Sequence, residues 1–236
     1  MRSAIRPLVA GRCNSEKIIR KLVYDMANDV RRILPVTDHV DKHNTYKTHM
    51  EQYKKAMKYG FYFEAILIDY ACMEDRLRAA LFHIGLLLHE SDYKVTAHRS
   101  KRVQAFREII RSYDVKANLG IGSITGKRKI IIAVLNYVRN GVQADENDET
   151  KMVLYTKLND KAKCDEILSL MREIEEWCGY RNEIIHSLMN KNIDSLHDQV
   201  AIKAEEGYGL FRQLDKQVQW IKKKQIRKAL GMTTTT

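Results

Sequence analysis

The chain has 236 residues, of which 44% are hydrophobic, and it carries a formal net charge of +11. This length allows a large domain to bury a substantial core, which excludes a small protein held together by disulfides. Only two prolines and eleven glycines interrupt the chain, and such a composition favours long helices over a turn-rich β fold. The excess of lysine and arginine predicts a surface that attracts polyanions, with nucleic acid or anionic lipid as the first partners to consider.

Three helices are predicted in the first half of the chain. Residues 15–34 place apolar side chains at intervals of three and four, and Pro35 ends this helix. A weaker helix, rich in tyrosine and lysine, is predicted over residues 44–59. The strongest periodicity of this half runs over residues 61–89, and it predicts a helix through the centre of a bundle.

The second half alternates helical patterns with one polar stretch. Residues 141–150 have no apolar period and are predicted to form an exposed loop. Gly179 is expected to end a helix, because glycine takes the positive φ of a helix C-cap at little cost. A new helix is then expected to start near Arg181. The other helices predicted here cover residues 101–113, 124–140, 160–178 and about 194–230.

These patterns predict an all-α protein in which residues 1–60 form a helical extension packed on a core bundle of residues 61–231. The four cysteines are scattered without a C-x-x-C pair, so we expect free thiols in a reducing cytoplasm. The longest apolar segment, around residues 61–73, carries two acidic residues and is too short to span a bilayer. We therefore expect no membrane anchor.

The stretch RNEIIH, residues 181–186, sets Arg181, Asn182 and His186 into an otherwise apolar helical pattern. Asn182 and His186 are four residues apart on one helical face, so the amide can hydrogen-bond the imidazole and fix its orientation. Arg181 is expected in a first helical turn, where free N–H groups and the helix dipole favour a bound phosphate. The same spacing in RAALFH, residues 78–83, lies in mid-helix and has alanine in place of the asparagine.

An Arg-Asn-x-x-x-His motif at the head of a helix in an all-α chain resembles the signature of the HEPN superfamily. A second similarity lies in AILIDYACMEDRLRAAL, residues 65–81, where Glu74, Leu77 and Arg78 match the Glu-x-x-Leu-Lys/Arg pattern of an early HEPN helix. The resemblance covers residues 61–225 and implies an HEPN-like antiparallel helical bundle, here with additional N-terminal helices.

The resemblance also implies an activity, namely metal-independent cleavage of RNA without a cofactor. His186 would act as general acid or base, since an imidazole can take or give a proton at neutral pH. Arg181 would clamp the phosphate, Asn182 would orient either group, and Glu74 would brace Arg181. One motif supplies one histidine, so a homodimer with a composite active site is expected. The family further implies a toxin–antitoxin or phage-defence role, with an antitoxin protein as a partner.

Other interpretations remain open. A non-catalytic HEPN-like module that binds RNA or a protein partner could contain the same RNEIIH motif. Asp69 and Glu74 lie in a mostly buried helix, where structural ion pairs are the simpler expectation for both. Leu188 stands where some HEPN toxins carry a tyrosine that a nucleotidyltransferase modifies, so that form of control is in doubt.

Three basic stretches, residues 100–111, 126–139 and 220–230, favour contact with a phosphate backbone, although solvated helix faces would look the same. Within the second stretch, Lys127, Arg128 and Lys129 are the predicted nucleic-acid-binding residues. Four tyrosines could stack on unpaired bases, and packing is the alternative role for them. They are Tyr46, Tyr53, Tyr59 and Tyr62.

Metal and nucleotide sites are not predicted. Asp38, His39, Asp41 and His43 lie close together in the sequence, but no further ligand follows at a defined spacing. The stretch GIGSITGKR, residues 120–128, departs from the P-loop pattern in its glycine spacing and in having arginine where serine or threonine is required.

Overall fold

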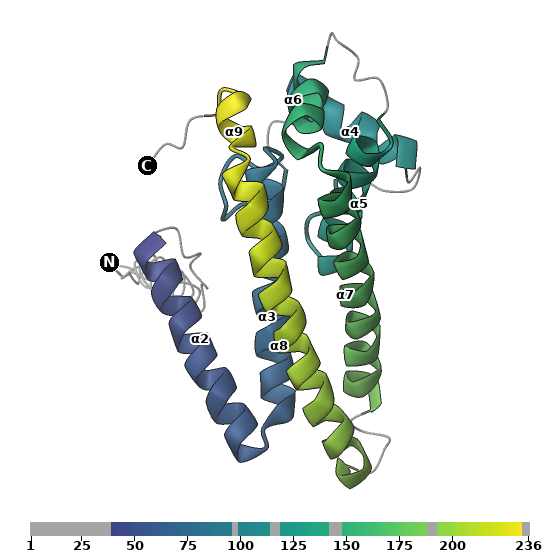
Figure 1. The fold of residues 1–236 in the computed structure, drawn as a ribbon. Coiled ribbons are helices and arrows are strands. Elements are labelled where there is room, and N and C mark those ends of the chain that lie inside the picture. Colours follow the sequence, from purple (N-terminus) through teal and green to yellow (C-terminus); the bar gives the residue numbers. More distant parts are fainter. Residues whose placement is uncertain (1–38, 96–98, 114–118, 142–147, 188–192, 233–236) are drawn as a thin grey trace, which may run out of the picture. The chain divides into compact units, whose positions relative to one another are not determined.

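The computed structural model describes residues 39–95, 99–113, 119–141, 148–187 and 193–232. The described residues form helices and no strand, which confirms the all-α prediction for this part of the chain (Figure 1). The helix predicted over residues 15–34 lies outside these ranges. The helices are α2 (His39–Tyr59), α3 (Tyr62–His83), α4 (Lys101–Tyr113), α5 (Ile124–Arg139), α6 (Glu149–Leu158), α7 (Lys161–Ser187), α8 (Ile193–Lys223) and α9 (Ile226–Ala229).

All of these helices belong to one compact unit that begins at Thr37. The domain boundary predicted at residue 60 therefore falls inside this unit, between α2 and α3. The α2 helix is held there by contacts with α3 and by Tyr53, whose hydroxyl donates to the carbonyl oxygen of Ala204 on α8 at 3.2 Å.

The most extensive helix pair consists of α3 and α8, which run side by side in the same direction (Figure 1). Arg76 near the middle of α3 contacts Asp215, and Phe82 near its end contacts Arg227 just after α8. The α7 helix runs antiparallel to α8, and α5 packs on both α3 and α7.

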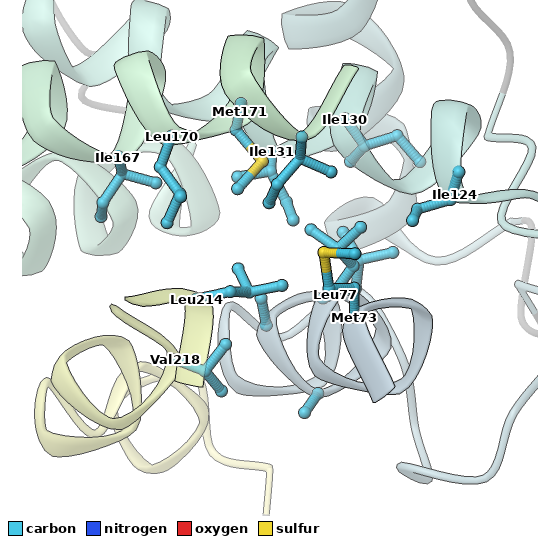
Figure 2. Packing of buried hydrophobic residues seen from close by; sticks show 14 of the residues in the cluster. Met73, Leu77, Ile124, Ile130, Ile131, Ile167, Leu170, Met171, Leu214 and Val218 are labelled. Carbon is cyan, nitrogen blue, oxygen red and sulfur yellow. The ribbon is translucent and has the colours of Figure 1, made fainter. Parts of the chain in front are cut away.

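Apolar side chains from α3, α5, α7 and α8 meet in one core (Figure 2). Burying each such side chain contributes about 1.5–3 kcal/mol, so the four helices hold one another in place. The labelled members of this core are Met73 and Leu77 on α3, Ile124, Ile130 and Ile131 on α5, Ile167, Leu170 and Met171 on α7, and Leu214 and Val218 on α8.

The α3 helix is shorter than predicted, because it ends at His83 rather than near residue 89. Gly85 has a φ of +91°, which turns the chain away from the helix axis. Leu86 and Leu87 are nevertheless buried, so the apolar period continues through a turn that is not helical. Arg227 closes this turn by donating to the carbonyl oxygens of Leu87 at 2.7 Å and Leu88 at 3.1 Å.

The prediction of a helix break at Gly179 is wrong, because α7 continues without interruption to Ser187. Gly179 does not have a positive φ. The buried stripe formed by Ile174, Cys178 and Ile184 runs past it, so burial on both sides outweighs the preference of glycine for a C-cap.

Two further boundaries differ from prediction. The helix α6 was not predicted, and it begins where the side chain of Asp148 accepts hydrogen bonds from the backbone N–H groups of Thr150 and Lys151. The last long helix ends at Lys223, well before residue 230, because Gln225 takes a left-handed φ of 52° and starts the short α9.

Candidate functional site

Arg181 extends from α7 to α3, where its guanidinium carbon lies 4.3 Å from the centroid of the Tyr70 ring. Its Nη1 donates to Asn182 Oδ1 at 2.9 Å, and its Nε is buried and has no acceptor among the described residues. No carboxylate in the described part of the chain forms an ion pair with Arg181, whereas Arg76 pairs with Asp75 and Asp215, and Arg128 pairs with Glu175. The arginine is thus positioned by an aromatic ring and an amide, and no ion pair with another described residue offsets its charge.

His186 is exposed in the last turn of α7. Because the helix is continuous, Arg181 and His186 point about 140° apart and lie about 7.5 Å apart along the axis. Asn182 directs its amide oxygen to Arg181, and no hydrogen bond joins it to His186 within the described residues. Arg181 lies near the carboxyl end of α7 rather than in a first helical turn. The prediction that free N–H groups and the helix dipole favour a phosphate there is therefore wrong.

Glu74 lies one turn after Tyr70 on α3 and pairs with Lys127 of α5. Lys127 Nζ donates to Glu74 Oε1 at 2.7 Å, and the lysine side chain is only 1% exposed. This confirms the expected structural ion pair for Glu74, and no bond to Arg181 is present in the described structure. The expected exposure of Lys127 is wrong, because its side chain lies on the face of α5 that packs into the bundle.

Arg128 is also an interior residue, with 2% of its side chain exposed. Its Nε donates to the carbonyl oxygen of Met171 at 2.8 Å, and its Nη2 donates to Glu175 Oε2 at 2.8 Å. The hydrogen bond from Arg128 lowers the pKa of Glu175. Of the three residues predicted to bind nucleic acid, only Lys129 is exposed. Lys127 and Arg128 instead join α5 to α3 and α7.

Asp69 is completely buried on α3, and neither carboxyl oxygen has a hydrogen-bond partner among the described residues. The expectation that it forms a structural ion pair is therefore wrong. Burial raises the pKa of Asp69 to about 8, so the carboxyl is mostly protonated at neutral pH.

The described residues contain no group of three His, Cys, Asp or Glu side chains that could hold a metal ion. His39, Asp41 and His43 lie on α2, and Asp38 is outside the described ranges. Tyr46 and Tyr53 are packed: Tyr46 donates to Asp75 Oδ2 at 2.6 Å and Tyr53 stacks on Tyr208, whereas Tyr59 is exposed.

The free cysteines of the described part, Cys72, Cys164 and Cys178, are all buried. Burial raises the pKa of the Cys72 thiol to about 12 and that of Cys178 to about 11, so neither is an activated nucleophile. Within the described ranges, no helix has the length and apolar character needed to cross a membrane.

Comparisons with protein-family models, with curated proteins and with solved structures found no match. The residue that sequence reasoning missed is Tyr70, the aromatic partner of Arg181. Its spacing from Glu74 indicates a shared helical face, but nothing in the sequence shows that α7 crosses that face at Arg181.

Proposed function

We propose that this chain is a metal-independent endoribonuclease of the HEPN type that acts as a homodimer. The observation that supports this best is the state of Arg181, which is held in position by Tyr70 and Asn182 while no carboxylate of the described residues pairs with it. A guanidinium group in that state is suited to a phosphodiester, because it can bind the anion without first releasing a carboxylate.

In the proposed reaction, one imidazole takes the proton from an RNA 2'-hydroxyl, and the 2'-oxygen forms a bond to the adjacent phosphorus. The bond from phosphorus to the 5'-oxygen breaks, and a second imidazole donates a proton to that leaving oxygen. The products are a 2',3'-cyclic phosphate and a 5'-hydroxyl. Arg181 would stabilise the negative charge that develops on the phosphate oxygens.

Two features of the single chain support the proposal of a homodimer: Arg181 and His186 diverge, and the motif supplies one histidine. Leu67 is 50% exposed, and it lies three residues before Tyr70 on the same face of α3. Leu67 thus adds an exposed apolar side chain to the face of α3 that carries Tyr70, and in the proposed dimer the second copy would cover it. The His186 side chains of both copies would then flank one phosphate, and Arg181 would contact its oxygens.

The test is incubation of the purified chain with labelled RNA in excess EDTA. We expect cleavage with 2',3'-cyclic phosphate ends, and a loss of at least 100-fold in His186→Ala. Arg181→Ala should lose cleavage as well. The control variant His43→Ala changes another exposed histidine, on α2, and should cleave RNA at the wild-type rate. Cleavage that requires a divalent metal, or that survives in His186→Ala, would contradict the proposal.

A cellular role as a toxin or phage-defence nuclease belongs to the same proposal, as does a reducing cytoplasm, which fits the free thiols. Expression should arrest growth, and His186→Ala should remove that effect. An antitoxin partner would be recovered with the inactive variant as bait.

A second candidate is a non-catalytic helical module that binds RNA or a protein partner. The divergence of Arg181 and His186 on one continuous helix, together with the bond of Asn182 to Arg181, favours it. Under this alternative, a folded wild type would bind RNA in EDTA without cutting it, and His186→Ala would bind equally well.

A further inference from the structure

The end of the bundle where α8 meets α9 carries dense positive charge. Between Lys216 and Met232 the sequence has no Asp or Glu. None of the lysines in this segment forms an ion pair within the described structure, whereas Lys42 and Lys127 elsewhere do. The basic residues of the segment are Lys216, Lys222, Lys223, Lys224, Arg227 and Lys228.

A helix dipole explains part of this pattern, since lysines in a last turn offset the partial negative charge of the free carbonyl groups. That account covers Lys222 and Lys223, the last residues of α8. The helix dipole does not explain Lys216, which lies two turns earlier, and it does not explain Arg102 and Arg227, which lie beside this end of α8.

Arg227 and Arg102 lie near each other with like charges. The Arg227 side chain is buried. Its pKa is lowered mainly by this burial and also by the positive charge of Arg102, whereas the negative charge of Asp92 raises it. The Nε of each arginine is buried and has no acceptor in the described structure. The Nη atoms of Arg227 are occupied by the carbonyl oxygens of Leu87 and Leu88, so Arg102 is the one of the two that can offer donors to an anion, and the charge of Arg227 beside it would stabilise that anion.

Trp220 adds an aromatic group to this surface. Its indole is half-buried, and Lys224 Nζ lies 4.5 Å from the ring centroid. Lys216 and Lys223 share its helical face, being four residues before it and three residues after it. Lysines around a partly exposed aromatic ring are the combination that holds single-stranded nucleic acid, with phosphates on the cations and a base on the ring.

We propose that this end of the bundle binds single-stranded RNA. The lysines and Arg102 contact successive phosphates, and Trp220 stacks on an unpaired base. A half-buried aromatic ring beside these cations favours nucleic acid over free phosphate, which needs cations alone, and a measurement with vesicles of anionic lipid distinguishes a lipid surface. The α8–α9 basic surface consists of Arg102, Lys216, Trp220, Lys222, Lys223, Lys224 and Lys228.

The surface is remote from Arg181, and the inference rests on the proposed function only for the choice of RNA as the ligand. Lys203 on α8 lies over the ring of Tyr180, next to Arg181. From Lys203 to Lys222 the helix rises about 28 Å. The surface would therefore hold a strand well away from the point of cleavage.

Binding is measured with the full chain carrying His186→Ala, so that cleavage cannot remove the probe. The probe is a 20-nucleotide fluorescein-labelled single-stranded RNA, followed by anisotropy at several salt concentrations. The variant Lys222→Gln/Lys223→Gln/Lys224→Gln should bind at least tenfold more weakly, and the slope of log affinity against log salt should fall by about 2. The control Lys54→Gln/Lys55→Gln/Lys58→Gln removes the same charge from exposed positions of α2 and should stay within about threefold of the parent.

Trp220 supplies a second readout. RNA should quench tryptophan fluorescence in the parent but not in Trp220→Phe, where only buried Trp177 remains. Trp220→Phe should retain binding and Trp220→Leu should lose severalfold, because only the former keeps a stacking ring. Circular dichroism confirms that each variant is folded.

The inference is overturned if the Lys222/Lys223/Lys224 variant binds like its parent, or if both triple variants lose affinity equally, since net charge alone would then account for binding. Binding to vesicles of anionic lipid without binding to RNA would also overturn it. RNA binding at this surface without cleavage by the wild type would leave the inference standing and refute the nuclease. Cleavage by the wild type in EDTA, together with unchanged RNA binding by the Lys222/Lys223/Lys224 variant, would support the nuclease and refute this inference.

Discussion

Asp69 on α3 faces Gly207 on α8 so closely that a Cβ atom built on Gly207 would lie 2.9 Å from Asp69 Oδ2. The same atom would lie 2.6 Å from Cζ2 of Trp177 on α7. Three helices therefore meet around a buried carboxylic acid that has no hydrogen-bond partner in the described structure. The absence of a side chain at residue 207 is what allows α8 to approach α3 at this depth.

Asp69 should make the protein less stable as the pH rises. Its folded pKa, about 8, lies above the unfolded value near 3.8, so the folded state holds the proton across that interval. The free energy of unfolding should fall by about 4 kcal/mol from this group between pH 4 and pH 7, and should stop falling above pH 8. Urea unfolding of wild type and Asp69→Asn across this range checks it. Equal pH slopes for the two proteins would contradict the prediction.

Gly207→Ala should destabilise the protein by about 2 kcal/mol, because the new methyl group must displace the buried Trp177 ring or the Asp69 carboxyl. Gly209 on the same helix has open space around its Cβ position and provides the matched control. Gly209→Ala should stabilise by up to about 1 kcal/mol through helix propensity alone. Thermal unfolding of the two variants should shift in opposite directions.

Gly179→Ala tests the continuity of α7. Apart from the adjacent residues and the backbone of α7 itself, no atom of the described structure lies within 4 Å of a Cβ built at residue 179, and its φ is not positive. Alanine should therefore stabilise the chain by up to about 1 kcal/mol. If the chain instead turned at Gly179 with a positive φ, the same substitution would lower the melting temperature.

Lys127 should prove to be a structural residue. Glu74→Gln leaves an ammonium group that is almost fully buried without its carboxylate, which should cost about 3 kcal/mol. The double variant Glu74→Gln/Lys127→Met removes both charges and should recover most of that loss. RNA affinity measured by anisotropy should be the same in the double variant and its parent. A tenfold loss of affinity would restore Lys127 as a nucleic-acid contact.

Tyr70 should act on cleavage through Arg181. Tyr70→Phe keeps a ring beneath the guanidinium group and should retain most activity, whereas Tyr70→Leu should lower kcat by about tenfold. Loss in both variants would point instead to the hydroxyl group. Measuring kcat and KM separately shows whether the change affects the bound state or the reacting phosphate.

The helices themselves were predictable, because apolar residues recur with the helical period in most of them. Helix ends were less predictable, since glycine serves both as a C-cap and as an interior residue. At Gly179 the buried stripe continues and the helix continues with it, whereas at Gly85 the stripe continues through a turn that Arg227 completes from the far end of the chain. Only tertiary contacts distinguish the two cases.

The candidate site was predictable in its residue types but not in its pairings. The motif drew attention to Arg181 and His186, yet the contacts of Arg181 with Tyr70 and of Lys127 with Glu74 join residues of different helices. Lysine and arginine are expected on the surface, because burying a charge is costly unless it is paired. The partner of Arg128, Glu175, is 47 residues away in the sequence, so no local pattern reveals it.

The parallel pairing of α3 with α8 also determines when the protein can fold. Its principal helix contact joins residues near position 70 to residues near position 210, and Arg227 closes the turn after α3 from about 140 residues further on. During synthesis, α3 leaves the ribosome long before either partner exists, with its apolar face still uncovered. We therefore expect chains that stop before α8 to aggregate, and full-length chains to refold slowly for an all-helical protein.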